Sequence, residues 1–449
     1  MLRRRRTVLT LFVLDSLATL VVFNVVGSYR GIIDHFIFSP LLGPVLALLL
    51  ALHLIDGYNA FKDMPMLEYA SLHIIAVLSA MLGILLLTYV FRFSPEYELQ
   101  SSRGVIAFSF LALIPVTLAY REMIRQEVLT RRGERAILFV GDATSCAAFC
   151  EEYGRMEMPQ PLIVSQTGTE PADPAPSFSE TLASVRAGRT QVEAIVLRES
   201  NRDLLPETER DLVRLYFEGV PTYTLELFHQ VYWKKIPLYR INPTWLFQEG
   251  FQIAREPVFE RLKRASDIGL SVLGLVLSAP LVAAAALAIW IEDRESAWFI
   301  QTRIGRNHVP FRLIKLRSMR TNRGTNSPYT LPRDSRITRV GRFLRATRLD
   351  ELPQLWNVLR GEMSLIGPRA EWDRLVEDYA RQIPCYDYRH LVKPGITGWA
   401  QINYRYGASL EDTVRKLEYD LYYIRHFSFV MDASIMMRTI QIMMFGKGR

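Results

Sequence analysis

The 449-residue sequence is poor in the residues that build disulfide scaffolds and transition-metal sites. Its three cysteines, Cys146, Cys150 and Cys385, form no CxxC pair and are too few for a disulfide framework. The seven histidines are scattered, with no HExxH motif and no His/Cys cluster at zinc spacing. The sequence therefore predicts no disulfide-stabilised domain and no zinc site, and it leaves open a hard cation held by carboxylates and phosphates.

The composition excludes two further classes of protein. Apolar residues make up 49% of the chain, with only 25 glycines and 23 prolines, whereas a disordered or collagen-like chain needs a skewed composition. A chain of this length has about three domains on a prior of one per ~150 residues. The net charge is +8, but charge is unevenly distributed, since long uncharged runs alternate with charged stretches.

Apolar runs close to the length of a membrane-crossing helix fill the first 120 residues. They lie at about 7–28, 36–55, 69–91 and 104–120. The first follows four arginines, but it is too long for the apolar part of a signal peptide and no small-residue cleavage site follows, so we expect a retained anchor. Asp15 within it is expected to face the bundle interior and to hydrogen-bond a neighbour. These runs predict a four-helix transmembrane domain over 1–120.

The placement of basic residues predicts the orientation of these spans. Arginines gather at the N-terminus and again after the fourth run, from Arg121 to Arg135, while the intervening outer loops have few. Positive charge marks the cytoplasmic side, and four crossings return the chain to the side on which it began. The remainder of the chain is therefore expected to begin in the cytosol.

Residues 135–255 have the pattern of a small soluble α/β domain. Short apolar strands are expected at 136–140, 162–164, 194–197 and 220–224, with a helix to about Tyr153 and a loop over 165–179. A dinucleotide site needs a glycine-rich turn after the first strand, and here only Gly141 is present. The pattern favours a degenerate Rossmann-like domain with a structural or regulatory role, whose ligand the sequence does not reveal.

A fifth uncharged run covers 268–291 and is interrupted by Ser278-Ala-Pro280. Hydropathy alone favours a membrane crossing, and a proline requires no more than a kink. However, a fifth crossing would place the basic C-terminal region outside, against the charge rule. A re-entrant helix, which enters the membrane, breaks at Ser278–Pro280 and returns on the same side, satisfies both observations.

Residues 300–349 carry 13 lysines and arginines and a single acidic residue, Asp334. Such a segment beside a membrane-embedded helix attracts phosphates or anionic lipid. A solvated surface held near anionic lipid is the simpler alternative. Nucleic acid is not expected as a partner, because the chain is membrane-anchored and has no helix-turn-helix or RNP pattern.

The basic segment is followed by a short helix signal that begins with two carboxylates. Asp350 suits an N-cap, Pro353 the first turn and Gly361 the C-terminal stop. Asp350 and Glu351 are thus expected at a helix N-terminus, where anions are favoured, with Asp350 kept ionised by the arginines. A carboxylate can attack phosphorus, and a neighbouring one can hold Mg²⁺. From these two residues alone, a capping Asp beside a surface Glu is the commoner arrangement.

The run from Asp350 to Arg369, DELPQLWNVLRGEMSLIGPR, resembles the bacterial sugar transferase family. These are the monotopic phosphoglycosyl transferases that start exopolysaccharide and O-antigen assembly. Further blocks match in the family's order and together cover about 256–449: Lys263-Arg264…Asp267, Gln301–Gly305, Lys315–Met319 and Lys393–Asn403. The N-terminal spans and the α/β region resemble the family's large members, the polyprenyl-phosphate glucose or galactose phosphotransferases.

The resemblance implies a role for each matched residue. Asp350 matches the nucleophile that attacks the β-phosphate of a UDP-sugar and releases UMP, and Glu351 matches its Mg²⁺-linked partner. Undecaprenyl phosphate then attacks the covalent intermediate to give undecaprenyl-diphospho-sugar. The matched blocks also imply substrate-binding and helix-break residues: Gln301, Arg303, Lys315, Arg317, Arg345, Arg369 and Arg405 for binding, Ser278 and Pro280 for the break. The chain departs from the family pattern at Ala370, usually proline, and at Tyr404, often glycine.

The sequence thus predicts a membrane α-helical bundle of four spans (1–120), a small Rossmann-like α/β domain (135–255) and an α-rich α/β catalytic domain (256–449). The resemblance implies a bacterial inner-membrane enzyme with its catalytic domain on the cytoplasmic face. Its partners would be a UDP-sugar, undecaprenyl phosphate, membrane lipid and, as large family members indicate, a second copy of the chain. A membrane-anchored nucleotide-sugar dehydratase or epimerase and a non-enzymatic assembly scaffold are the alternatives. No motif identifies the sugar.

Overall fold

The structure is a computed structural model, in which the chain divides into two compact units, 1–233 and 234–449. It describes residues 2–32, 34–58, 66–90, 102–133, 135–156, 158–166, 178–198, 206–238, 257–320, 336–404, 407 and 409–445. Each unit is described by itself.

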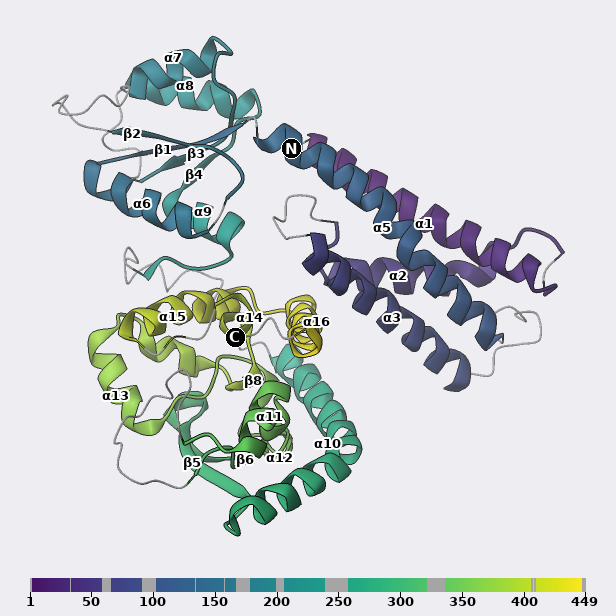
Figure 1. Ribbon diagram of the computed structural model, residues 1–449. Coiled ribbons are helices and arrows are strands. Elements are labelled where there is room, and N and C mark those ends of the chain that lie inside the picture. The colour runs from purple at the N-terminus through teal and green to yellow at the C-terminus, as the bar shows by residue number, and fades with distance from the viewer. Residues whose placement is uncertain are drawn as a thin grey trace. The chain divides into compact units, whose positions relative to one another are not determined.

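The first unit begins with a bundle of apolar helices (Figure 1). They are α1 (Leu2–Tyr29), α2 (Leu42–Leu54, preceded by the 3-10 turn η1, Ser39–Leu41), α3 (Met66–Val90) and α5 (Arg103–Gly133). Of these, α1, α3 and α5 are long and apolar enough to cross a membrane, which confirms three of the expected spans. The helix in the second run, 36–55, is shorter than predicted. The 13 residues of α2 extend over only about 20 Å, whereas the hydrocarbon core of a membrane is ~30 Å thick.

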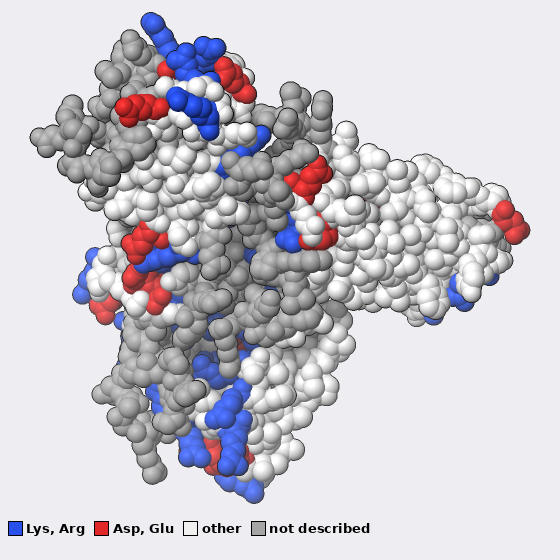
Figure 2. All heavy atoms as spheres, turned by 45° about the horizontal axis from the view of Figure 1, so that its top comes forward, with Lys and Arg blue, Asp and Glu red and all other residues white. Residues whose placement is uncertain are grey.

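The surface and the interior of the bundle differ in polarity as a membrane protein requires. On the face drawn in Figure 2 the bundle is uncharged over most of its length, with charged side chains at its ends. Asp15 is fully buried, and its carboxylate accepts hydrogen bonds from the hydroxyls of Tyr58 (2.7 Å) and Tyr120 and from the guanidinium of Arg121. The expectation that Asp15 faces the interior and bonds a neighbour is confirmed.

A parallel four-stranded sheet forms the rest of the first unit. Its strands are β1 (Ala136–Gly141), β2 (Leu162–Gln166), β3 (Val192–Leu197) and β4 (Thr222–Thr224), in the order β2-β1-β3-β4. The small parallel sheet that the strand pattern predicts is confirmed. Its helices are α6 (Ala143–Arg155), α7 (Phe178–Arg186), α8 (Pro206–Phe217) and α9 (Leu225–Phe228). Figure 1 shows α6 and α9 on one face of the sheet and α7 and α8 on the other. Most of the expected loop, 167–177, lies outside the described residues.

The turn after β1 carries a negative charge where a dinucleotide-binding protein needs room for a pyrophosphate. Asp142 caps α6, accepting a hydrogen bond from the backbone N–H of Ser145 (3.0 Å), and it forms an ion pair with Arg198, which follows β3. The Ser145 hydrogen bonds, with help from Arg198, hold the pKa of Asp142 below its usual value. This anionic cap opposes phosphate binding at the N-terminus of α6.

The second unit is an α-rich α/β fold built around two small sheets (Figure 1). Its strands are β5 (Trp298–Ile304) and β6 (Pro310–Leu316), an antiparallel hairpin, and β7 (Ser364–Ile366) and β8 (Gly395–Thr397), a parallel pair. Its helices are α10 (Pro257–Asp293), α11 (Arg339–Thr347), α12 (Gln354–Arg360), α13 (Asp373–Gln382), α14 (Trp399–Asn403), α15 (Leu410–Arg425) and α16 (Phe429–Phe445). Residues 234–238, which the sequence assigned to the middle domain, belong to this unit: the backbone N–H of Ile236 donates to the carbonyl of Glu418 (3.0 Å).

Helix α10 contains the fifth apolar run and is the fourth helix of span length. It stays helical through Ser278 and Pro280, and Figure 1 shows it changing direction part-way along its length. The predicted break is therefore a bend within one continuous helix, since proline removes one hydrogen bond and crowds the preceding turn without ending the helix. A narrow row of side chains packs on the domain, whereas large apolar side chains such as Val276 and Leu277, both 67% exposed, point away from it.

The Asp15 cluster gives a test of the bundle. Arg121→Met leaves the buried Asp15 carboxylate without its cationic partner, so we expect a loss of about 3–5 kcal/mol in unfolding free energy. The double variant Asp15→Leu/Arg121→Met removes both charges and should recover most of that loss. Unfolding of the three proteins in detergent measures the difference, and equal stability of the single and double variants would contradict the expectation.

Candidate active site

The Asp350–Glu351 pair lies in a turn between two helices. Helix α11 ends at Arg348, which has left-handed backbone angles (φ 56°), and Leu349–Glu351 form a single 3-10 turn, η10, before α12 starts at Gln354. The expectation that Asp350 caps the helix is wrong, because Pro353 occupies that position and no side chain caps α12. The predicted stop at Gly361 is confirmed, with a left-handed φ of 83°.

Helix α11, which leads into this turn, is tied to the return end of α10. The hydroxyl of Thr338 accepts the N–H of Gly341 (2.8 Å) as an N-cap. The carboxylate of Glu292, at the end of α10, accepts the backbone N–H groups of Arg339 (2.9 Å) and Val340 (3.4 Å). A side chain of the apolar helix thus satisfies the first free donors of α11.

Asp350 is a buried carboxylate among cations. It is 8% exposed and accepts no hydrogen bond from any residue that the structure describes. Burial, together with the negative charge of Glu351, raises its pKa to about 6, against the opposing effect of Lys315, Arg345 and Arg369. The expectation that arginines keep Asp350 firmly ionised is therefore only partly met. With this pKa the carboxylate is mostly ionised at neutral pH, and its burial leaves it poorly solvated.

Glu351 is held by two arginines, one on each carboxylate oxygen. Arg369 donates to Oε1 (3.0 Å), and the guanidinium of Arg348 lies 3.6 Å from Oε2. Burial acts to raise the pKa of Glu351, but the charges of Arg369 and Arg348 outweigh it and hold the pKa below its usual value. The two neighbouring carboxylates thus have opposite pKa shifts, as expected of groups with different chemical roles.

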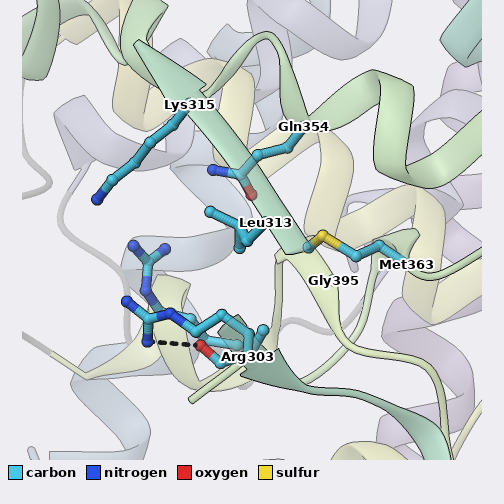
Figure 3. A pocket seen from close by; sticks show the side chains of 8 residues that line it. Arg303, Leu313, Lys315, Gln354, Met363 and Gly395 are labelled. Atoms are coloured by element: carbon cyan, nitrogen blue, oxygen red, sulfur yellow. Dashed lines mark hydrogen bonds between the residues drawn. The ribbon is translucent and has the colours of Figure 1, made fainter. Parts of the chain in front are cut away.

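A pocket beside the pair gathers positive side chains from β5, β6 and the segment after β7. Figure 3 shows the head groups of Lys315 and Arg303 pointing into a common space, with Gln354 on its wall. The full lining is Arg303, Leu313, Lys315, Gln354, Met363, Arg369, Ala370 and Gly395. Burial and the nearby Arg369 and Arg303 lower the pKa of Lys315 to about 8. Lys315 and Arg369 connect the pocket to the carboxylates, since both act on the pKa of Asp350.

Other residues expected at the site have different surroundings. Gln301 supports the pocket indirectly, because its Oε1 accepts a hydrogen bond from Arg303 (2.7 Å). Arg345 is near enough to lower the pKa of Asp350, and its Nη1 lies 3.3 Å from the Met319 sulfur.

Arg317 is not among the residues that line the pocket. The buried guanidinium of Arg317 forms ion pairs with Asp293 and Glu295 near the return end of α10. These ion pairs tie the end of β6 to the return end of α10, and the expected substrate-binding role of Arg317 stays a prediction. Arg405 lies outside the described residues.

Sequence reasoning missed two residues of the site, Arg348 and Gln354. Gln354 follows Asp350 by four residues, a spacing that signals a shared helical face. Arg348 precedes Glu351 by three residues within a crowded run of arginines, where nothing in the sequence sets it apart.

Comparison with known proteins matches the sequence of this region to a family. Residues 258–446 match the family described as bacterial sugar transferase. The UDP-glucose:undecaprenyl-phosphate glucose-1-phosphate transferase of Caulobacter vibrioides is 42% identical over 40% of this chain and 68% of its own length. The chain belongs to the bacterial sugar transferase family.

Two further relatives show what kinds of protein the chain is similar to. One is the UDP-N-acetylgalactosamine-undecaprenyl-phosphate N-acetylgalactosaminephosphotransferase of Aeromonas hydrophila, 37% identical over 58% of this chain and 61% of the relative. The other is the UDP-glucose:undecaprenyl-phosphate glucose-1-phosphate transferase of Escherichia coli K12, 43% identical over 40% of this chain and 39% of the relative. The chain thus spans less than two thirds of the length of each of these two relatives.

A magnesium ion, expected for this sugar transferase, fits the carboxylate pair. The described residues contain no group of three or more His, Cys, Asp or Glu that could enclose a metal. Mg²⁺ does not need such a group, because it binds through one or two carboxylates and substrate phosphates. Glu351 raises the pKa of Asp350 by repulsion, and a divalent cation between them would relieve that repulsion.

The raised pKa of Asp350 predicts an effect on stability. The folded state binds this proton more tightly than an ordinary Asp of pKa 3.8, so ionisation of Asp350 costs stability between about pH 4 and 6, and the full cost applies above that window. Asp350→Asn stays neutral and should be more stable than the wild type by about 1–3 kcal/mol at about pH 8. The difference should vanish near pH 4.

Thermal unfolding of the purified proteins in detergent at both pH values measures this difference. Asp378→Asn, at an exposed position of α13, gives the baseline for the same chemical change. An Asp350→Asn variant that is no more stable than the wild type at the higher pH would show that burial does not penalise the charge.

Proposed function

We propose that this protein transfers a sugar 1-phosphate from a UDP-sugar to undecaprenyl phosphate and so starts exopolysaccharide or O-antigen synthesis. The names of its relatives support this reaction with glucose or N-acetylgalactosamine as the sugar. The observation that carries the mechanism is Asp350, a buried carboxylate without a described hydrogen bond, beside a pocket lined by Arg303, Lys315 and Arg369. The positive charges of these three side chains complement the negative charges of a diphosphate group.

The first half-reaction uses Asp350 as the nucleophile. One carboxylate oxygen attacks the β-phosphorus of the UDP-sugar, the bond from that phosphorus to the bridging oxygen breaks, and UMP leaves with the bridging oxygen. Lys315 and Arg369 bind the phosphoryl oxygens and offset the charge that develops on them. Mg²⁺ held by Glu351 supplies further charge neutralisation at the diphosphate when it is bound.

The second half-reaction returns the enzyme to its starting state. A phosphate oxygen of undecaprenyl phosphate attacks the phosphorus of the aspartyl-phosphosugar, the acyl-phosphate bond breaks, and Asp350 regains its carboxylate. The covalent intermediate lets one site serve a water-soluble donor and a lipid acceptor in turn. The exposed apolar side chains of α10 support a site at the membrane surface, and the distribution of basic residues in the sequence supports the cytoplasmic side, where the donor is made.

A turnover assay tests the reaction and the nucleophile together. Purified protein receives Mg²⁺, undecaprenyl phosphate and labelled UDP-glucose, UDP-galactose or UDP-N-acetylgalactosamine. One donor should give lipid-linked phosphosugar and an equal amount of UMP, and Asp350→Asn should lower the rate at least about 10³-fold because it removes the nucleophile. Without lipid acceptor, mass spectrometry should find a phosphosugar on Asp350.

The outcome separates this reaction from the alternatives. Release of UDP, or full activity of Asp350→Asn, would reject the mechanism. Conversion of the sugar without a lipid product would indicate the dehydratase or epimerase alternative, and no chemistry with any donor would favour the scaffold.

Sidedness of α10 tests the membrane topology. In a cysteine-free background, Ser266→Cys and Ser296→Cys place one label on each side of the apolar run, both at exposed positions. A re-entrant helix predicts that both react with an impermeant thiol reagent only from the cytoplasmic side. Reaction from opposite sides would establish a crossing, and Pro280→Leu, which straightens the helix, is expected to produce that pattern.

A further inference from the structure

Arg348 adopts a backbone conformation that non-glycine residues rarely have. Its φ of 56° and ψ of 18° are left-handed, a region that costs roughly 1–2 kcal/mol for a residue with a Cβ. The conformation serves the turn, because the N–H of Arg348 donates to the carbonyl of Leu344 and its own carbonyl accepts the N–H of Glu351 (3.2 Å). Glycine would make the same turn without strain.

The side chain of Arg348 reaches the same carboxylate as Arg369 from another direction. Arg348 approaches Oε2 of Glu351 and Arg369 bonds Oε1. The two side chains are similarly exposed, 45% for Arg369 and 37% for Arg348, but Arg369 lines the pocket and Arg348 does not. A diphosphate in the pocket therefore competes with Glu351 for Arg369 but not for Arg348.

We propose that Arg348 is a positioning residue, which keeps Glu351 oriented while Arg369 turns from Glu351 to the phosphates of the substrate. This inference rests on the proposed function. An arginine at position 348 strains the backbone, which glycine would not do. In return, the arginine side chain provides the second contact to Glu351.

Three substitutions separate the side chain from the backbone. Arg348→Gly removes the guanidinium and suits the left-handed conformation, Arg348→Asn tolerates that conformation without a charge, and Arg348→Lys keeps a cation. Arg381→Ala removes an arginine from a surface ion pair with Glu377 (3.4 Å) and serves as the control. The full-length protein is used, with kcat, the KM for the UDP-sugar and the unfolding temperature as readouts.

Arg348→Gly and Arg348→Asn should lose about tenfold or more in kcat, since a small misplacement of a reacting group is costly, with KM changed by less than about twofold. The unfolding temperature of the glycine variant should equal or exceed that of the wild type. Arg348→Lys should retain kcat within about threefold, because it still offers Glu351 a cation. Arg381→Ala should match the wild type in all three readouts.

A glycine variant with wild-type kcat would overturn the inference, because the arginine would then matter only through the turn. A loss of kcat that follows a lowered unfolding temperature, without recovery in Arg348→Lys, would overturn it as well. In both cases an active wild type leaves the proposed function standing. A wild type that forms no lipid-linked phosphosugar with any donor would reject the proposed function, and this inference with it.

Discussion

The repulsion between two neighbouring carboxylates is the constraint on which the second unit depends. Asp350 and Glu351 are adjacent in sequence and both largely buried, so burial and the charge of Glu351 together destabilise the charged form of Asp350. The fold balances them with cations from separate segments: Lys315 on β6, Arg345 on α11 and Arg369 after β7. Because these segments meet only in the folded protein, the electrostatic environment of the pair is a property of the tertiary structure.

The balance is uneven, and its unevenness is chemically useful. Glu351 has direct contacts with two arginines, whereas Asp350 has cations nearby but no described hydrogen bond. A carboxylate fixed by guanidinium groups suits an orienting or ion-holding role. A carboxylate that is charged, and that accepts no hydrogen bond from the described residues, keeps its lone pairs for bond formation. The same two residue types thus acquire different properties from their surroundings.

Local patterns in the sequence predicted the elements of the fold well. The alternation of short apolar strands with helices predicted the parallel sheet, and Gly361 predicted the end of α12. The prediction failed where tertiary contacts override local preference. Asp350 has the features of an N-cap but lies in the 3-10 turn η10, because α11 stops at Thr347 and α12 begins only at Gln354.

The site was predicted by residue type and only partly by geometry. Lys315, Arg303 and Arg369 reach the pocket as the motifs suggested, but Arg317, in the same motif as Lys315, turns to Asp293 and Glu295. An arginine of a basic run forms ion pairs within the protein only where the fold brings an acidic side chain near it, and the remaining arginines can face a pocket. One-dimensional spacing cannot supply that information, and Arg348 escaped notice for the same reason.

The attachment of α10 to the helices around the carboxylates has a mechanical consequence. Glu292 at the end of α10 binds the first amides of α11, and Gly274 in its middle approaches α12 so closely that a Cβ there would lie 3.0 Å from a Leu355 methyl group. Any displacement of α10 therefore also displaces α11 and α12. The position of the carboxylate pair is therefore coupled mechanically to that of the apolar helix.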